Sequence, residues 1–368
     1  MRTPLCDVLG IEFPIVAFTH CRDVAAAVSK AGGLGVLGIG AYTPEQMETE
    51  LTWIENEIGD KPYGVDVLIP AKAKEVGDPA SIDALLPEAH KKFVAELLEK
   101  YDVAPLPTAA QPPVLGGVTE QAVSLVDVAL SRRIRLVASA LGPPPPHLIE
   151  SAHARGVLVA ALVGSARHAL RQKDAGVDII VAQGYEAGGH TGEIGTMVLV
   201  PEVVDAVAPL PVLAAGGIAT GRQFAAAMAL GAQGVWTGSV WLTTQEAETH
   251  PVVKEKFLRA SSSDTVRSRA TTGKPARQLR TAWTEAWDDP SAPQPLPMPL
   301  QQALTHEARL RIARSAAGSG PGARELITYF VGQVVGSMNH VKPARQVVFD
   351  MVNEYLEVAQ RFADALEP

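Results

Sequence analysis

The segment from Ile179 to Thr196, IIVAQGYEAGGHTGEIGT, carries the residues best suited to chemistry. It opens with an apolar, β-branched run that predicts a short buried strand, and it continues as a glycine-rich loop. The loop glycines are Gly184, Gly188, Gly189, Gly192 and Gly195. Because glycine lacks a Cβ, such a backbone can approach an anion or a flat ring closely. The segment therefore indicates a ligand site at a strand end, with Gln183, Glu186 and His190 as its polar side chains.

His190 is the only imidazole in this loop. Imidazole titrates near neutral pH, so it can accept or donate a proton during catalysis. A lone histidine is more often a surface residue or a satisfied core residue. The position of His190 inside a glycine cluster after a strand favours the catalytic interpretation, and we predict that it is the catalytic residue.

Two later segments have the pattern of phosphate-binding turns. Residues 214–221, AAGGIATG, and residues 231–239, GAQGVWTGS, each combine glycines with an apolar strand. Glycines before a helix N-terminus direct free amides and the positive end of the helix dipole toward an anion. Each segment alone is also compatible with a tight turn. Because they follow each other on the last two predicted strands, together they predict a phosphate site.

Eight short apolar runs predict eight strands. They contain Ile15, Val36, Val65, Val137, Val159, Ile180, Leu213 and Val235. Helical patterns separate them, and eight βα units close a parallel barrel of about 250 residues. A doubly wound open sheet is the competing topology, but it would normally place a GxGxxG turn after its first strand. The glycine-rich turns come late in this chain, so we predict a (β/α)8 TIM barrel with its active site at the carboxyl ends of the strands.

The chain is longer than such a barrel. We assign the barrel to residues 1–245 and treat residues 71–113 as an insertion after the third strand, because plain connections are rarely so long. A helix is predicted within the insertion, from His90 to Lys100. Residues 246–345 predict a mainly helical addition, and residues 346–368 predict a C-terminal helix.

Local signals predict where several helices begin. Asp23 and Thr43 are expected N-cap residues, and Pro44 follows at the first turn. A later helix is expected to begin at Pro201.

Composition indicates a globular protein that acts on a small molecule. Of the 368 residues, 47% are hydrophobic and 20% are charged, and the net charge is −8. This charge disfavours binding to nucleic acid or to an anionic membrane, and no segment approaches the roughly 20 apolar residues of a membrane span. Cys6 and Cys21 lack metal-ligand spacing, so we expect no metal site, no disulfide framework and a cytoplasmic location.

A basic cluster precedes the C-terminal helices. Its members are Arg267, Arg269, Lys274, Arg277 and Arg280. They could line a site for an anionic substrate or a nucleotide, but a solvated face is the favoured interpretation. Gly332 and Gln333, further along the chain, could reach back to the site.

Taken together, these segments resemble the nitronate monooxygenases, formerly called 2-nitropropane dioxygenases, and their close relative, the flavin-containing enoyl-acyl-carrier-protein reductase. The matching motifs are GIEFPI at 10–15, AVSKAGGLG at 27–35, QGYEAGGH at 183–190, AGGI at 215–218, GVWTGS at 234–239, TGKPAR at 272–277 and GQVVG at 332–336. The resemblance covers most of the chain. It implies an FMN-dependent TIM barrel that uses O2 and a small substrate, a nitronate or another small organic anion. A homodimer is one oligomeric state compatible with such an enzyme.

Carried over by position, the resemblance also implies where FMN binds. The phosphate would contact the amides of Gly216, Gly217, Gly238 and Ser239, beside Ala215. The ring would lie near Ala17, Phe18, Gln183, Gly188 and Gly189. His190 matches the family's active-site histidine, which would hydrogen-bond the nitro group or assist proton movement. Because a nitronate is already a stabilised carbanion, the protein would mainly hold it beside the flavin, which passes an electron to oxygen.

The chain departs from the family pattern at two places. The family usually has proline and methionine after the first strand, whereas this chain has Phe18-Thr19-His20-Cys21, which adds a second histidine near the site. An asparagine commonly meets the flavin on the third strand, and here the residue is Asp66. A negative charge at Asp66 would make flavin reduction harder unless the carboxyl is protonated or paired.

Two alternative functions stay open. The first is an NAD(P)H-dependent FMN reductase of an enoyl thioester or a quinone, with which the segment from Gly192 to Pro201 is equally compatible. The second is a barrel that binds flavin or phosphate without catalysis, because a barrel fold does not by itself establish an activity.

Overall fold

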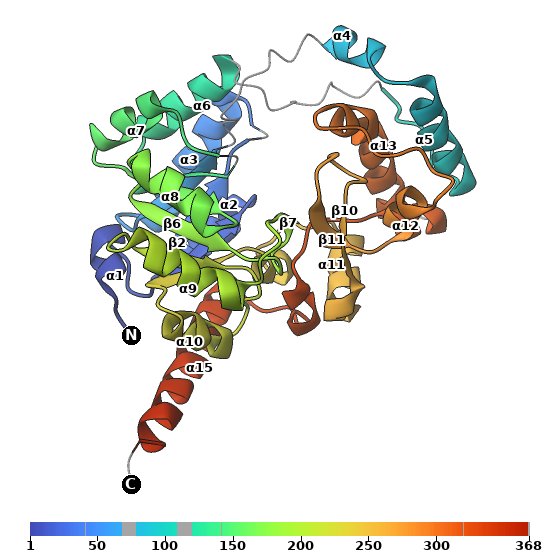
Figure 1. Cartoon of the computed structure of the whole chain (residues 1–368). Coiled ribbons are helices and arrows are strands. Elements are labelled where there is room, and N and C mark those ends of the chain that lie inside the picture. Colours follow the sequence, from blue (N-terminus) through green and yellow to red (C-terminus); the bar gives the residue numbers. More distant parts are fainter. Residues whose placement is uncertain (41, 68–78, 109–119, 141, 319, 367–368) are drawn as a thin grey trace.

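A computed structural model describes residues 1–40, 42–67, 79–108, 120–140, 142–318 and 320–366. Eight parallel strands close in the order β1-β2-β3-β4-β5-β6-β8-β9 (Figure 1), which confirms the predicted TIM barrel. They are β1 (Ile15–Thr19), β2 (Leu34–Gly38), β3 (Tyr63–Val67), β4 (Leu136–Ser139), β5 (Leu158–Val163), β6 (Ile179–Gln183), β8 (Val212–Ala215) and β9 (Gly234–Thr237). Because the strands are parallel, their carboxyl ends meet at one end of the barrel, which we call the mouth.

Helices on the outside of the barrel connect these strands. They are α2 (Arg22–Lys30), α3 (Pro44–Ile58), α6 (Glu120–Leu130), α7 (Pro146–His153), α8 (Ala166–Asp174), α9 (Thr196–Val207) and α10 (Gly221–Ala229), with α1 (Pro4–Leu9) before the first strand. The predicted cap at Thr43 is confirmed. Its hydroxyl accepts from the Gln46 amide at 3.2 Å, while the Gln46 side chain accepts from the Thr43 amide at 2.9 Å. This reciprocal pair satisfies two amides at the start of α3.

Two other predicted helix starts are wrong. Helix α2 begins at Arg22, and Cys21 rather than Asp23 occupies the N-cap position, without a side-chain cap. Helix α9 begins at Thr196, so Pro201 lies inside it. The carboxylate of Glu186 accepts from the Thr196 amide at 3.0 and 3.1 Å and caps α9 from the preceding loop. A contact between segments therefore outweighs the local proline signal.

The barrel strands separate two apolar cores. Val16, Val36 and Leu213 belong to the cluster inside the barrel, whereas Ile15 and Val65 belong to the cluster between strands and helices. Alternate residues of a strand face opposite sides, so these clusters define which side chains point into the barrel.

The insertion and the C-terminal addition pack together beside the barrel (Figure 1). The insertion contributes α4 (Pro79–Ala84) and α5 (Glu88–Lys100), and Phe93 of α5 meets Trp287 at 4.8 Å between ring centroids. The addition contains η1 (Ser239–Thr243), α11 (Pro251–Arg259), η2 (Ser262–Asp264), β10 (Thr265–Ser268), β11 (Ala276–Leu279), α12 (Ala282–Asp288), α13 (Leu300–Ala317), α14 (Pro321–Leu326) and η3 (Gln333–Ser337). The remaining parts of the predicted insertion, 71–78 and 109–113, lie outside the described residues.

The addition is not purely helical, because β10 and β11 form an antiparallel sheet with β7 (Gly189–His190) from the barrel loop. This sheet attaches the addition to the mouth. The last helix, α15 (Ala344–Asp364), packs on α10 and α2, and its C-terminal turns extend beyond the body (Figure 1). None of the described helices is both long enough and apolar enough to cross a membrane.

Candidate active site

Four of the predicted site residues lie at the carboxyl ends of strands and face the inside of the barrel. Phe18, Asp66, Gln183 and Ala215 belong to β1, β3, β6 and β8. Phe18 and Ala215 pack in the inner cluster, Gln183 lies two residues after Val181 of that cluster, and Asp66 lies between two residues of the outer cluster, Val65 and Val67. Ala17 is different. Its methyl group belongs to the outer cluster, so only its backbone could contact a ligand in the mouth.

The two glycine turns predicted to bind phosphate lie side by side, after β8 and β9. Gly216 and Gly217 have φ values of 92° and 74°, in the left-handed region that glycine tolerates. Among the hydrogen bonds that join described residues, none has the amide of Gly216, Gly217 or Gly238 as its donor. A Cβ added at Gly238 would meet no heavy atom closer than 3.9 Å, a side-chain carbon of Phe18. These turns therefore form an open cradle of free amides.

The N-terminus of α10, in contrast, is already occupied. The amides at this end already have hydrogen-bond acceptors. The side-chain oxygen of Gln223 accepts from the Ala219 amide at 2.8 Å and from the Thr220 amide at 3.1 Å, and the carboxylate of Glu354 on α15 accepts from the Gly221 amide at 2.9 Å. A carboxylate thus lies at the positive end of this helix. The expected contribution of the α10 dipole to anion binding is wrong, and the anion-binding capacity rests on the glycine amides.

The glycine-rich loop after β6 is tightly held. Besides capping α9, Glu186 accepts from the Thr196 hydroxyl at 2.8 Å, and this hydroxyl also lies 2.9 Å from the Gly216 carbonyl oxygen. A Cβ at Gly188 would lie 2.8 Å from the Gly332 nitrogen. The Gly332 amide donates to the Ser239 hydroxyl at 2.8 Å, which confirms that this late segment reaches back to the site. Glu186 is therefore a structural residue of the loop.

His190 lies on β7, between the barrel and the addition. Its Nδ1 is 3.2 Å from the Pro275 carbonyl oxygen, and its ring centroid is 6.4 Å from that of Phe330. A carbonyl can only accept, so Nδ1 carries the proton and Nε2 keeps its lone pair. Burial lowers the pKa of His190 below its usual value, the Pro275 carbonyl opposes this shift, and nearby Lys274 reinforces it. His190 is thus a neutral imidazole with one acceptor nitrogen available.

The basic cluster divides into a pair that packs on the Tyr185 ring, half-buried Arg267 and buried Arg277, and three exposed residues. The guanidinium carbons of Arg277 and Arg267 lie 4.5 and 5.3 Å from the centroid of the Tyr185 ring. Arg277 is only 3% exposed and donates to the Tyr185 carbonyl at 3.2 Å. The solvated-face interpretation is therefore wrong for this pair, which fastens the addition to the loop. It holds for the three exposed residues, Arg269, Lys274 and Arg280.

Asp66 is buried, with 3% of its surface exposed. No ion pair or side-chain hydrogen bond joins it to another described residue. Burial raises the pKa of Asp66 to about 8, because a carboxylate loses hydration that no residue in the described ranges replaces. The carboxyl group is therefore mainly protonated at neutral pH, which removes the negative charge expected from the sequence.

Aromatic rings close the barrel below the mouth. The rings of Phe18 and Trp236 stack with centroids 6.3 Å apart and planes at 20°. His20 packs edge-on against Phe18 at 5.1 Å. Sequence reasoning missed Trp236, which belongs to the inner cluster. Its place directly after the outward-facing Val235 could have indicated an inward side chain, because the side chains of a strand alternate.

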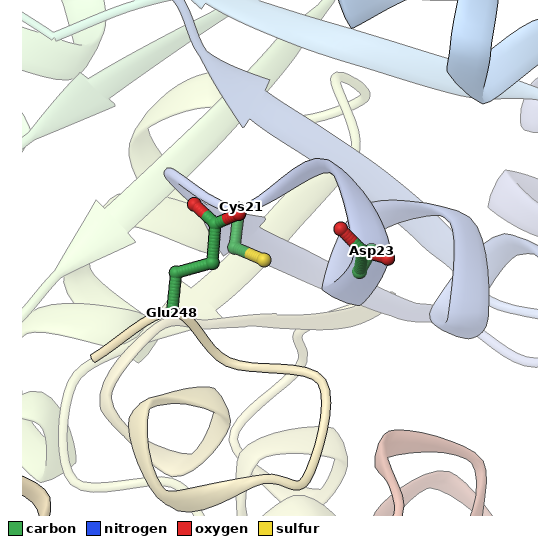
Figure 2. Close-up of side chains that lie close together, drawn as sticks. All are labelled: Cys21, Asp23 and Glu248. Carbon is green, nitrogen blue, oxygen red and sulfur yellow. The ribbon is translucent and has the colours of Figure 1, made fainter. Parts of the chain in front are cut away.

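Cys21, Asp23 and Glu248 bring three potential metal-ligand atoms within 4.8 Å of one another (Figure 2). The Cys21 thiol donates to the Glu246 carbonyl at 3.2 Å. Burial raises the pKa of this thiol, and the thiolate is the form that binds metal. We therefore assign no metal to this cluster.

Comparisons with known proteins give the chain a family. The sequence profile of the nitronate monooxygenase family matches residues 2–354. Rv1533, a candidate monooxygenase of Mycobacterium tuberculosis, is 61% identical, with 97% of each chain covered. A nitroalkane oxidase of Streptomyces ansochromogenes has a TM-score of 0.80 at 28% identity, covering 97% of this chain and 99% of that one. FabK of Thermotoga maritima has a TM-score of 0.75 at 31% identity, covering 100% of both chains.

These matches confirm both the predicted family and the predicted relationship to FabK. They extend over the barrel and the addition alike, so the likeness is not that of a barrel alone. The chain belongs to the nitronate monooxygenase family and is an oxidoreductase of that type.

Proposed function

We propose that the protein is an FMN-dependent oxidoreductase that oxidises alkyl nitronates with O2. The observation that carries this proposal is the pairing, at one mouth, of an open glycine cradle with a neutral imidazole. The cradle fits a phosphate monoester, because backbone amides without acceptors can bind an anion. When bound, FMN would supply the electron transfer between substrate and oxygen.

The residues proposed to hold FMN divide by position. Gly216, Gly217, Gly238 and Ser239, beside Ala215, would receive the phosphate. Phe18, Asp66, Gln183, Gly188 and Gly189 would surround the ring, with the Ala17 backbone beside them. Ser239 can contribute its hydroxyl proton, since its oxygen already accepts from the Gly332 amide. His190 is the proposed catalytic residue.

The task proposed for His190 follows from its tautomer. With the Nδ1 proton directed at the Pro275 carbonyl, Nε2 can accept a proton or a hydrogen bond from the bound substrate. Its lowered pKa keeps the ring neutral over most of the physiological range. Two contacts within the protein orient the ring, the Pro275 carbonyl at Nδ1 and the Phe330 ring, whose centroid lies 6.4 Å away.

A nitronate is a small anion, and the site has groups that suit it. Lys274 lies beside His190, and its charge contributes to the lowered pKa of the imidazole. The carboxyl of Asp66 is mainly neutral, so it does not repel an anion in the mouth. The absence of a negative charge there removes the main objection that the sequence raised.

The direct test is a spectrum of the purified protein followed by anaerobic mixing with ethyl nitronate. We expect flavin absorption that bleaches with the nitronate and returns when O2 is admitted. His190→Asn should keep the flavin and lose about 100-fold or more in turnover if the imidazole handles a proton. A colourless protein that does not take up added FMN would refute the proposal.

A reductase is the second candidate, and the likeness to FabK over the full length of both chains favours it. Such an enzyme would take hydride from NADH or NADPH and reduce an enoyl thioester or a quinone. The same anaerobic experiment separates the two candidates. Rapid bleaching by a nicotinamide cofactor, without bleaching by the nitronate, would identify the reductase.

A further inference from the structure

The strand that carries His190 is too short to fix its own position. β7 consists of Gly189 and His190 alone, and it pairs with β11 through Arg277 opposite Gly189 and Ala276 opposite His190. Gly189 has a φ of 75°, so half of this strand is not in extended backbone. A register shift of one residue would turn the His190 side chain to the other face of the sheet. Contacts outside this two-residue ladder must therefore hold His190 opposite Ala276.

Two arginines bind the backbone on both sides of β7. Nε of Arg277 donates to the Tyr185 carbonyl at 3.2 Å, and Nη2 of Arg267 donates to the Thr191 carbonyl at 3.2 Å. Tyr185 lies four residues before β7, and Thr191 directly follows it. The length of backbone between these two hydrogen bonds contains His190, so the two guanidinium groups restrain the loop before and after the imidazole.

The two arginines project from one face of the sheet and share one aromatic ring. Arg267 and Arg277 are register partners on β10 and β11, so their side chains lie on the same face. Like charges directly opposite each other in a sheet are destabilising. The Tyr185 ring offsets part of this cost, because its face attracts both guanidinium groups, whose carbons lie 5.3 and 4.5 Å from its centroid. Tyr185 therefore ties the pair to the loop through its ring as well as its carbonyl.

The pair does not serve a strong ion pair within the described part of the chain. Arg277 is 3% exposed and has no carboxylate partner there, and its Nη1 donates to the Thr265 hydroxyl at 3.1 Å. Arg267 has Glu193 at 3.7 Å, but that carboxylate side chain is 86% exposed. A buried guanidinium loses hydration, which a paired carboxylate usually offsets. Here backbone carbonyls take the donors instead, so the pair fixes the path of the chain.

The backbone that carries Arg277 also carries the partner of the imidazole. β11 begins at Ala276, directly after Pro275, whose carbonyl oxygen lies 3.2 Å from Nδ1 of His190. Hydrogen bonds weaken steeply with distance and misalignment, so a movement of about 1 Å between β11 and the loop would lose this contact. Without the carbonyl, nothing in this contact would select which ring nitrogen carries the proton.

We propose that Arg267 and Arg277 are positioning residues for His190. They hold the loop and β11 together, so that the Pro275 carbonyl keeps the proton on Nδ1 and leaves Nε2 as the acceptor. The effect of the pair on turnover rests on the proposed function, because that function assigns the catalytic role to His190. Its effect on the tautomer does not, because the tautomer depends on contacts within the protein.

The test compares Arg267→Met, Arg267→Lys and Arg277→Lys with the control Arg280→Met, in protein to which FMN is added to saturation. Arg280 is an exposed member of the same basic cluster and directly follows β11. Nitrogen NMR of protein labelled in histidine reports which ring nitrogen is protonated, and the His190 signals are those missing from His190→Asn. The same samples give kcat and KM for ethyl nitronate, and circular dichroism checks that each variant is folded.

Wild type and Arg280→Met should show the tautomer with the proton on Nδ1. Arg267→Met should show a mixture of tautomers and about tenfold lower kcat, with KM changed by less than about twofold, because a displaced catalytic group slows turnover more than it weakens binding. Arg267→Lys should recover most of this loss, since an ammonium can donate to the Thr191 carbonyl. Arg277→Lys should recover less, because it lacks the planar fork that reaches both the Tyr185 carbonyl and the Thr265 hydroxyl.

The two readouts keep the proposals apart. The positioning role is overturned if Arg267→Met matches the control in tautomer and in kcat, or if its kcat falls while the tautomer stays unchanged. If Arg267→Met does not fold, Arg277→Lys is judged against the control by the same two criteria. If the tautomer responds as expected but no sample turns over the nitronate, the proposed function fails and the positioning role stands.

Discussion

The replacement of Asp66 by asparagine should change how the stability of the apoprotein depends on pH. In the unfolded chain this carboxyl has the ordinary pKa of 3.8, whereas in the folded protein burial raises it to about 8. The folded state therefore retains a proton that the unfolded state loses between these values. Linkage makes the free energy of unfolding fall as pH rises through this window, by at most about 1.4 kcal/mol per pH unit.

The size of the effect follows from the two pKa values. If the carboxyl is fully ionised in the unfolded chain and protonated in the folded protein, the free energy of unfolding falls by at most roughly 6 kcal/mol by pH 8. Water entering the mouth would reduce this penalty, so we expect a loss of about 2 to 4 kcal/mol in wild type. Asparagine has the same shape and no titration. The difference in the free energy of unfolding between Asp66→Asn and wild type should grow from pH 4 to pH 8 and then level off.

Urea unfolding of the apoprotein, followed by circular dichroism at pH 5, 7 and 9, measures this difference. Wild type and Asp66→Asn share every other titrating group, so subtraction isolates the one carboxyl. The exposed residue Asp127 supplies the control, because Asp127→Asn should leave the pH dependence unchanged. Parallel stability curves for wild type and Asp66→Asn would refute the assignment of a protonated, buried Asp66.

Four further predictions follow from the site. Gly217→Val should strain a left-handed backbone and abolish FMN binding in a folded protein, and stoichiometric FMN in that variant would contradict the cradle. Glu186→Ala should lower the free energy of unfolding by about 1 to 2 kcal/mol through loss of the α9 cap, measured by urea, and an unchanged midpoint would remove this role. Arg277→Met should lower the free energy of unfolding, measured by urea, by about 2 to 4 kcal/mol, because the buried guanidinium that donates to the Tyr185 carbonyl is lost. Arg277→Lys keeps the charge but not the planar fork, so it should recover only part of this free energy. The turnover rate should fall at acid pH, below the ordinary imidazole pKa of 6.5, where His190 gains a proton, and an acidic limb that survives in His190→Asn would assign it to another group.

Periodicity and glycine placement were sufficient to predict the architecture. The eight apolar runs became the eight barrel strands, because each run is short, β-branched and separated from the next by a helical pattern. The cap at Thr43 was also predictable, since Thr43 and Gln46 lie within one turn of chain. Such features depend on neighbours in sequence, and the residues themselves carry the information.

Other features depended on contacts between distant segments. Glu186 caps α9 from a preceding loop, so the helix begins five residues before the local proline signal. The basic pair Arg267 and Arg277 packs against the Tyr185 ring, although a run of charged residues usually predicts a solvated face. The short strand that carries His190 exists only because β11, more than 80 residues later, pairs with it.

The sequence by itself determined the barrel, its late glycine turns and the candidate imidazole, because strand period and glycine freedom are local properties of the chain. Only the tertiary structure decided the protonation state of Asp66 and the tautomer of His190. Burial keeps the proton on Asp66, and the Pro275 carbonyl selects the tautomer of His190. Charge and tautomer depend on which atoms surround a group in space, and no spacing along the chain specifies those atoms.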